Sequence, residues 1–172
     1  VGSEMCIRDS PYLHSTDVGP VIDTTAKTKL VKHIERMTAT EKKVAELTLG
    51  EEHQHGDFVA PSAFEIRDIS CLEEEQFGPI LHIVRFKANE LHQIVERINS
   101  TGFGLTMGIH SRNETTYRWI EKHARVGNCY INRDQVGAVV GVQPFGGQGL
   151  SGTGPKAGGP HYLFRFTQTS FS

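Results

Sequence analysis

The chain has 172 residues, a formal net charge of −2 and 37% apolar residues, which is enough for one globular domain with a real core. No apolar run approaches the roughly 20 residues that a membrane span requires. The three cysteines, Cys6, Cys71 and Cys129, show no C-x-x-C spacing, which argues against a disulfide framework and against a zinc site. No signal-peptide pattern is present, so a reducing, cytoplasmic compartment is the default.

The charge is unevenly divided along the chain. Residues 1–111 carry 11 basic and 17 acidic side chains, whereas residues 112–172 carry 7 and 3. A mild positive surplus beside a glycine-rich stretch suits a small anionic ligand, but it is too weak to indicate nucleic-acid binding. The first ten residues, VGSEMCIRDS, show no periodicity that joins them to the rest of the chain. We therefore expect residues 1–10 to be a non-native leader, or the edge of a truncated gene, ahead of a domain at 11–172.

The first predicted element is an amphipathic helix over residues 24–39, for which Asp23 or Thr24 is a suitable N-cap. Its apolar side chains recur at helical spacing, at Leu30, Val31, Ile34 and Met37. A weakly alternating strand is predicted at 43–49, followed by a polar loop at 51–57.

Two features of the next stretch have competing interpretations. The spacing of the pair His53-x-His55 would suit two metal ligands, but no third ligand lies near it in the sequence, so a solvated loop is favoured. Residues 58–66 are predicted to be extended. Pro61 is expected to keep this segment from being a regular central strand.

Strands alternate with helices from residue 80 to residue 133. The predicted strands are 80–86, 104–110 and 128–132, and the predicted helices are 89–100 and a second one that Asn113 caps and that ends near Ala124. This βαβαβ order predicts an α/β fold with a mostly parallel sheet and flanking helices. A closing strand is predicted at 162–167.

The stretch 136–160 follows the last of these alternating strands, and 9 of its 25 residues are glycine. Ligands of parallel sheets lie outside the carboxyl ends of the strands, so we interpret this stretch as a site loop. Within it, residues 147–152 match the dinucleotide fingerprint G-x-G-x-x-G. We reject that interpretation because Pro144 and Pro155 flank the motif, whereas the fingerprint needs a strand directly before it and a helix that opens within it.

Several motifs carry a family resemblance. They are Glu75-Gln-Phe77-Gly78-Pro79, Asn99-x-x-x-Phe103-Gly104-Leu105, Gly127-Asn128, Asn132 and Pro144-Phe145-Gly146-Gly147. In this order and spacing they resemble the C-terminal part of the aldehyde dehydrogenase superfamily. The stretches 17–23, 136–147 and 149–160 resemble more closely the L-glutamate γ-semialdehyde (1-pyrroline-5-carboxylate) dehydrogenases, in the version found in bifunctional proline utilization A proteins. The resemblance covers residues 11–172 and identifies them as part of such a catalytic domain.

The resemblance implies an NAD-dependent enzyme that oxidises L-glutamate γ-semialdehyde to L-glutamate in proline catabolism. In that family a cysteine thiolate attacks the aldehyde, hydride leaves to the nicotinamide, and water activated by a glutamate hydrolyses the thioester. The nucleophile, the base and the Rossmann domain lie N-terminal to the matched segment. We therefore expect no catalytic residue in this chain, which alone is expected to be inactive. The alternatives are a non-catalytic interaction module and a dehydrogenase for another aldehyde.

The resemblance also assigns cofactor-binding residues. Glu75 matches the glutamate that holds the ribose hydroxyls on the nicotinamide side of NAD, and Phe77 matches the residue packed beside the nicotinamide. The alternatives are that Glu75 belongs to a solvated charge run at 73–75 and that Phe77 is a core residue. Cys6, Cys71 and Cys129 match no catalytic position, and Cys71 and Cys129 are expected to be buried thiols.

The substrate side is assigned in the same way. Gly137 and Ala138 match the loop that anchors the substrate's α-carboxylate through backbone N–H groups, and Phe145 matches the aromatic residue that packs on the substrate's aliphatic stem. A tight structural turn and a plain core phenylalanine are the alternatives. Lys156 is expected to be a solvent-facing lysine rather than a group that attracts an anionic substrate. The resemblance further implies a homo-oligomer, with the last strand near the subunit contacts.

Overall fold

The computed structural model describes residue 14 and residues 16–53, 55–136 and 138–167. The predicted leader at 1–10, Cys6 and Gly137 lie outside the described residues. The chain divides into two compact units, Val1–Arg85 and Phe86–Ser172, which we call unit 1 and unit 2. Within the described ranges, no helix is both long and apolar enough to cross a membrane.

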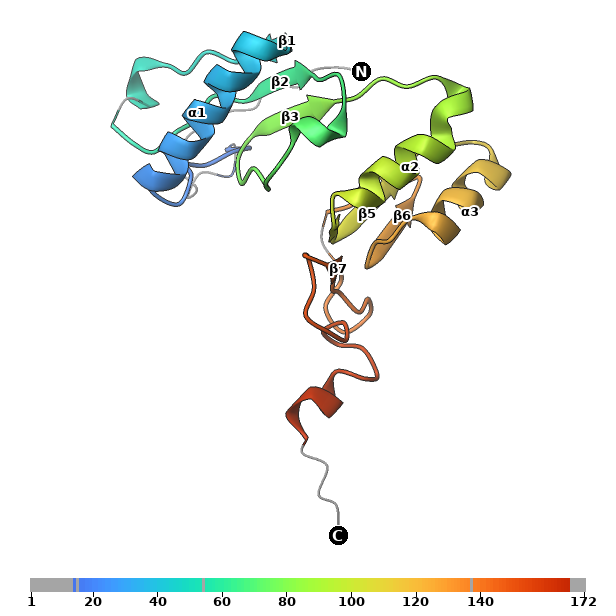
Figure 1. Cartoon of the computed structure of the whole chain (residues 1–172). Coiled ribbons are helices and arrows are strands. Elements are labelled where there is room, and N and C mark those ends of the chain that lie inside the picture. The colour runs from blue at the N-terminus through green and yellow to red at the C-terminus, as the bar shows by residue number, and fades with distance from the viewer. Residues whose placement is uncertain (1–13, 15, 54, 137, 168–172) are drawn as a thin grey trace. The chain divides into compact units, whose positions relative to one another are not determined.

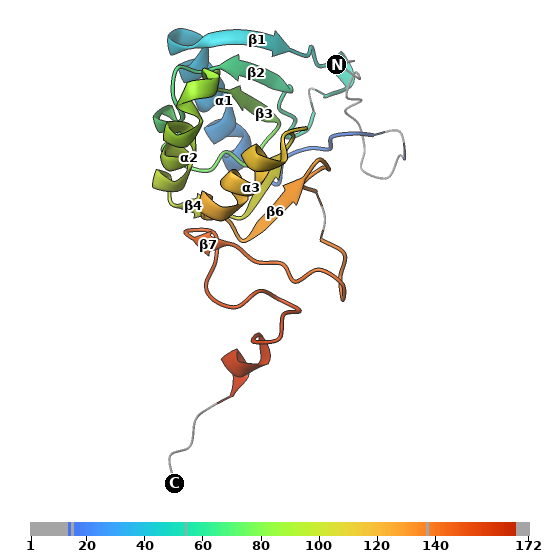
Figure 2. The same cartoon turned by 90° about the vertical axis from the view of Figure 1, so that its right-hand side faces the viewer.

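Unit 1 contains a helix that covers a three-stranded sheet. Its elements are α1 (Thr24–Thr40), β1 (Lys42–Glu46), η1 (Glu51–His53), β2 (Ser62–Glu65), η2 (Ile69–Cys71) and β3 (Ile80–Ile83). The strand order is β1-β2-β3, with β1 antiparallel to β2 and β2 parallel to β3. Figures 1 and 2 show α1 running along this sheet, and it contacts both β1 and β2.

The helix α1 begins where the sequence predicts. Asp23 is the N-cap, and its carboxylate accepts a hydrogen bond from the backbone N–H of Ala26 at 2.7 Å. From the core-facing side of the helix, Met37 packs with Phe64 and Ile66, and the side chains of Met37 and Phe64 are fully buried. Burial of these three apolar side chains holds the helix on the sheet.

Two predictions for the sheet of unit 1 are wrong. The first is that Pro61 would prevent a regular central strand. β2 is the middle strand of the sheet, and Pro61 lies one residue outside it. The donors of the strand itself are therefore intact, and the backbone N–H of Ser62 donates to the carbonyl of Pro79 at 3.0 Å. The strand predicted at 80–86 ends at Ile83, where its pairing with β2 ends, and Leu81 within it is 60% exposed.

Unit 2 contains two helices and two short strand pairs in its described part. Its elements are η3 (Ala88–Glu90), α2 (Leu91–Ser100), β4 (Phe103–Gly104), β5 (Thr106–Ile109), α3 (Glu114–His123), β6 (Asn128–Ile131), β7 (Gln148–Gly149) and η4 (Leu163–Phe166). As predicted, Asn113 caps α3, and α3 connects two parallel strands, β5 and β6. Figure 1 shows α2 and α3 beside β5 and β6.

A stack of aromatic rings joins the two helices. The indole of Trp119 in α3 lies 3.9 Å from the ring of His92 in α2 and 4.2 Å from the ring of His123, measured between centroids. Asn99, near the end of α2, donates to the carbonyl of His123 at 2.9 Å and accepts from the backbone N–H of Arg125 at 2.7 Å. The end of α3 is thereby held against α2, immediately before the chain enters β6.

The single βαβαβ sheet predicted over residues 80–133 is wrong for the described residues. β3 pairs with β2, which precedes the predicted unit, while β5 pairs with β6 in a separate sheet. The strand predicted at 162–167 is also wrong. The backbone N–H groups of Arg165 and Thr167 donate to carbonyls three residues earlier, which forms η4 and removes the donors of an edge strand. The homo-oligomer therefore stays a prediction from the resemblance alone.

Candidate functional site

Glu75 and Phe77 line the same hollow of unit 1, which has a volume of about 310 Å³. The hollow lies between the start of α1 and residues 72–79. We call residues 72–79 the cofactor segment, because the family resemblance assigns Glu75 and Phe77 to cofactor binding. Phe77 is 79% exposed, so it is not a core residue in this chain. Glu75 is exposed too, and its carboxylate is therefore accessible to the hydroxyl groups of a ligand.

The cofactor segment approaches α1 closely at Gly78. A Cβ atom at this position would lie 2.5 Å from Cδ1 of Leu30, so only glycine fits here without moving the helix side chain. The other wall of the hollow comes from α1 and its cap, and it includes Ala26 and Lys29. The sequence predictions do not include these two residues. The signal was present, because Ala26 and Lys29 follow Asp23 at intervals of three, which places them along one side of the helix.

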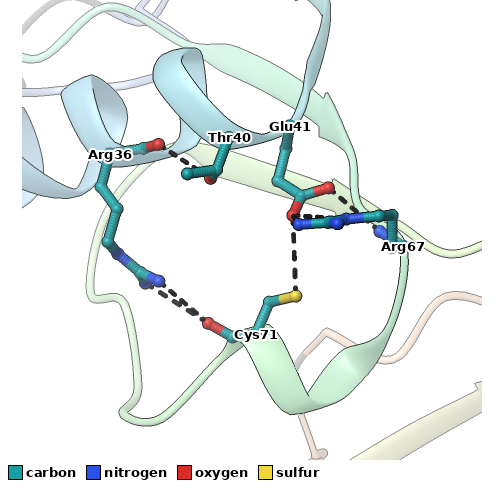
Figure 3. Close-up of polar contacts among 5 residues, drawn as sticks. All are labelled: Arg36, Thr40, Glu41, Arg67 and Cys71. Carbon is teal, nitrogen blue, oxygen red and sulfur yellow. Dashed lines mark hydrogen bonds and ion pairs between the residues drawn. The ribbon is translucent and has the colours of Figure 1, made fainter.

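The end of α1 holds the turn η2, which leads directly into the cofactor segment (Figure 3). The guanidinium of Arg36 donates to the carbonyl of Cys71 from both terminal nitrogens, each at 3.3 Å. The thiol of Cys71 donates to Glu41 at 3.7 Å, and the same carboxylate binds the backbone N–H and the guanidinium of Arg67. The Glu41 side chain is only 3% exposed, so this ion pair is partly shielded from solvent.

Arg36 also begins a chain of two histidines. Its Nη2 atom lies 3.2 Å from Nδ1 of His33, and Nε2 of His33 lies 2.8 Å from Nε2 of His82 in β3. Arginine only donates, so Nδ1 of His33 must accept. A neutral His33 then carries its proton on Nε2 and donates it to His82, whose own proton is on Nδ1.

Both histidines are held in the neutral form. Burial lowers the pKa of His33 below its ordinary value of 6.5, with further lowering by His82 and Arg36 and a smaller opposing effect of Glu74. Burial and then Arg36 lower the pKa of His82 in the same direction. A proton added to Nε2 of His82 would break the histidine pair, and a proton added to Nδ1 of His33 would break its contact with Arg36. Either proton would put a second cation beside the guanidinium.

Acidification should therefore destabilise unit 1. Because both pKa values are lower in the folded protein, the unfolded chain binds more protons below about pH 6.5, and the free energy of unfolding should fall between pH 6.5 and the lowered pKa values. Thermal unfolding at pH 7.5, 6.5 and 5.5 measures this loss. The matched variant is His82→Gln, whose amide oxygen still accepts from His33 but does not titrate. An identical pH dependence in wild type and His82→Gln would contradict the prediction.

The glycine-rich loop of unit 2 begins with a closed turn. Gly137 lies outside the described residues, and its neighbour Ala138 is half-buried. The backbone N–H of Gln143 donates to the carbonyl of Val139 at 2.9 Å, while its side-chain oxygen accepts from the N–H of Val139 at 3.2 Å. Gly141 has a φ of 80°, a left-handed conformation that glycine adopts readily and that this turn requires.

Phe145 is held by its backbone on both sides. Its N–H donates to the carbonyl of Ala157 at 3.0 Å, and its carbonyl accepts from the N–H of Ala157 at 2.9 Å. Asn128, which is buried in β6, donates to the carbonyl of Pro144 at 3.0 Å and accepts from the N–H of Gly146 at 3.2 Å. The ring of Phe145 is half-buried, which leaves part of it accessible. One motif asparagine thus fixes the chain directly before and after the predicted substrate residue.

A hollow of about 610 Å³ lies between β6 and the glycine-rich loop. Its lining includes the basic residues Arg133, Lys156 and His161 and contains no acidic residue. The Arg133 guanidinium lies over the ring of Tyr130, 4.8 Å from its centroid. Lys156 is half-buried and lines this hollow, whereas the sequence predicts a solvent-facing lysine. Part of the positive charge of residues 112–172 is therefore concentrated around this hollow.

The two described cysteines are half-buried rather than fully buried as predicted. Burial, followed by the charge of Glu121, raises the pKa of the Cys129 thiol. Because the thiolate is the nucleophilic form, Cys129 is not activated for attack on a carbonyl. The Cys71 thiol is engaged with the Glu41 carboxylate.

As predicted from the flanking prolines, residues 147–152 match the letters of the dinucleotide fingerprint but do not form its structure. No helix opens within them, and Gln148 and Gly149 form β7, which pairs with β4. The serine of this stretch, Ser151, accepts from the backbone N–H of Gly104 at 3.1 Å. These glycines therefore shape a β-bridged loop rather than a phosphate cradle.

The His53-x-His55 pair shows no sign of a metal centre in the described part of the chain. The ring of His53 packs edge-on against Phe58, with the centroids 4.9 Å apart. Among the described residues, no group of three or more His, Cys, Asp or Glu side chains could hold a metal ion.

The comparison with known families tests the family resemblance. The sequence profile of the aldehyde dehydrogenase family matches residues 4–171. The chain belongs to the aldehyde dehydrogenase family. This aldehyde dehydrogenase chain is 49% identical over 165 residues to the bifunctional protein PutA of Rhizobium meliloti, covering 96% of the chain and 14% of PutA. It is 40% identical over 162 residues to the 1-pyrroline-5-carboxylate dehydrogenase of Geobacillus sp. (strain WCH70), covering 92% of the chain and 30% of that protein.

Solved structures agree with this aldehyde dehydrogenase assignment. A crystal structure of proline utilization A from Bradyrhizobium japonicum matches with a TM-score of 0.83 and 52% identity, covering 88% of this chain and 15% of the other. The 1-pyrroline-5-carboxylate dehydrogenase from Thermus, solved with bound NAD, matches with a TM-score of 0.77 and 37% identity, covering 88% and 29%. The predicted α/β aldehyde dehydrogenase fold is confirmed. The chain spans less than a third of the length of each of these four proteins.

Proposed function

We propose that this chain is part of an NAD-dependent dehydrogenase that oxidises L-glutamate γ-semialdehyde to L-glutamate in proline catabolism. The observation that carries the proposal is the loop around Phe145, because its backbone is held on both sides by Asn128 and it adjoins a hollow with basic lining. An aldehyde dehydrogenase with this loop suits an aldehyde that also carries an anionic group. The name of the 1-pyrroline-5-carboxylate dehydrogenase relative supports the same substrate.

The cofactor assignment rests on the hollow of unit 1. Glu75 would accept hydrogen bonds from the two hydroxyls of the nicotinamide ribose, and the exposed ring of Phe77 would pack beside the nicotinamide. Both side chains are accessible and line one hollow, so the residues present fit this half of NAD. When bound, NAD supplies the hydride acceptor of the reaction.

The substrate assignment uses the first half of the glycine-rich loop. Gly137 and Ala138 would offer backbone N–H groups to the α-carboxylate, and Phe145 would pack against the aliphatic stem of the substrate. Lys156 and Arg133 would raise the local concentration of an anion near this loop. An uncharged aldehyde would gain nothing from either feature.

On its own the 172-residue chain should form no NADH. The raised pKa of Cys129 and the engagement of Cys71 with Glu41 leave neither described cysteine as an activated nucleophile. An absorbance assay for NADH with the isolated chain, beside the full-length protein that carries it, tests this directly. NADH formation by the isolated chain would contradict the expectation, whereas a full-length protein that ignores glutamate semialdehyde would contradict the proposed activity.

Adding bulk at Gly137 should separate charged from uncharged substrates. In the full-length protein, Gly137→Val should raise the KM for glutamate semialdehyde by roughly tenfold, the equivalent of one hydrogen bond to a charged group, because a side chain would keep the carboxylate from the backbone. The KM for propionaldehyde, which has no carboxylate, should change much less. Initial rates with the two aldehydes at saturating NAD give the comparison. Equal increases in KM for both substrates would contradict the proposed binding of the α-carboxylate at Gly137 and Ala138.

A further inference from the structure

The middle of the cofactor segment has little packing of its own, whereas near its ends Leu72 packs against the core of unit 1 and Gly78 lies against Leu30. The glutamates at 73–75 are exposed, and the ring of Phe77 is 79% exposed. A segment with few buried contacts follows a course that is decided mainly by what holds its two ends. The position of Glu75 and Phe77 is therefore a property of the residues that bind the chain before and after them.

Arg36 holds the first end. Both terminal nitrogens of its guanidinium donate to the carbonyl of Cys71, the residue directly before the segment, at 3.3 Å each (Figure 3). From another side, Glu41 binds the thiol of the same cysteine. One residue of α1, Arg36, and its C-cap, Glu41, thus fix the point at which the chain leaves η2.

The same guanidinium reaches the second end through a histidine. Its Nη2 atom donates to Nδ1 of His33, which donates from Nε2 to His82 at 2.8 Å. His82 lies in β3, three residues beyond the segment. His33 is 6% exposed, so the middle of this link is shielded from solvent. Arg36 therefore contacts the chain before the segment directly, and it contacts the chain after the segment through His33.

We propose that Arg36 is a positioning residue for the cofactor segment, because its guanidinium joins the two ends of residues 72–79 and so fixes where Glu75 and Phe77 lie. The inference rests on the proposed function, since it takes Glu75 and Phe77 as cofactor contacts. A planar guanidinium presents several donors in fixed directions and serves the Cys71 carbonyl and His33 together. A lysine ammonium keeps the charge but lacks this rigid fork.

The test is Arg36→Lys in the full-length protein. We expect the KM for NAD to rise about two- to tenfold, the effect of losing one ordinary hydrogen bond, with the KM for the aldehyde unchanged. Competitive inhibition by AMP, which carries only the adenosine half of NAD, should also be unchanged. The matched control is Glu35→Gln on the adjacent position of α1, an exposed residue for which no side-chain contact is seen among the described residues. It should alter none of these constants.

A double-mutant cycle shows whether Arg36 acts through Glu75. Adding Arg36→Lys to Glu75→Gln should raise the KM for NAD less than it does in the wild type, because the contact that it positions is already weakened. KM does not depend on the active fraction of enzyme, so partial unfolding of a variant would lower only the maximal rate. If Glu75→Gln raises the KM for NAD and Arg36→Lys does not, or if Arg36→Lys raises both KM values equally, the inference is wrong. If Glu75→Gln itself has no effect, the cofactor assignment fails, and the inference fails with it.

Discussion

Replacing Glu75 with glutamine in the full-length protein should raise the KM for NAD by roughly ten- to a hundredfold, which is the effect of hydrogen bonds worth about 1.5–3 kcal/mol to a charged group. A carboxylate accepts from two hydroxyls at once, whereas an amide presents one oxygen and an NH₂ group that cannot accept. The KM for the aldehyde should stay the same, because the substitution affects only the cofactor side. Initial-rate measurements of NADH formation at varied NAD provide both constants.

Glu73→Gln is the matched control for this prediction. Glu73 belongs to the same run of three exposed glutamates and lines a different hollow, with Lys29, Lys32, His33, Arg36 and Glu74. The substitution removes the same charge two residues away. If Glu75 only belongs to a solvated charge run, the two variants should behave alike. A large effect at Glu75 and none at Glu73 supports the ribose contact, and equal effects would exclude it.

Replacing Gly127 with alanine should have the largest effect on unit 2. An added Cβ atom would overlap the carbonyl oxygen of Gly146, and the atoms that must move are backbone rather than the end of a flexible side chain. Forced overpacking typically costs about 1–3 kcal/mol, and a backbone clash belongs at the upper end of that range. The displaced segment is the one that Asn128 fixes around Phe145. Hydrogen exchange of the full-length protein should therefore show lost protection over residues 142–150.

Gly141→Ala separates steric overlap from the general cost of replacing a glycine. Gly141 has a φ of 80° but no atom within 4 Å of an added Cβ atom. Alanine there should cost about 1–2 kcal/mol through backbone strain in its own turn. It should leave the hydrogen-exchange protection of the Gly146 amide near the wild-type value. If Gly127→Ala retains wild-type protection at Gly146, the close approach of these two glycines is not essential.

Local sequence signals predicted the helices well. The bounds of α1 and α3 and their caps at Asp23 and Asn113 agree with the prediction within about one residue, because capping and helical spacing depend on neighbours within one or two turns. The strand β6 was predicted for the same reason, as a short apolar run that ends at Asn132. The strand predicted at 162–167 failed because the same composition also suits a 3-10 turn.

The motifs behind the family resemblance have a physical meaning that only the structure reveals. Asn99 holds the end of α3, Asn128 holds the loop around Phe145, and Asn132 exchanges two hydrogen bonds with the backbone of Ser111. Each amide both donates and accepts, so each replaces a missing backbone partner in an irregular segment. In the sequence these asparagines are only marks of the family. In the fold they hold the loops that the proposed site depends on.

By itself the sequence determined the family, the α/β class, the main helices and the residues proposed for the cofactor and the substrate, because these follow from short-range patterns and motif order. Only the tertiary structure decided which strands pair, where β2 lies relative to Pro61, and how Arg36 joins Cys71 to His82. These contacts link residues 16 to 49 positions apart. The energy of such contacts depends on distances in space that no local pattern contains, so a burial pattern or a motif identifies the residues without showing what they touch.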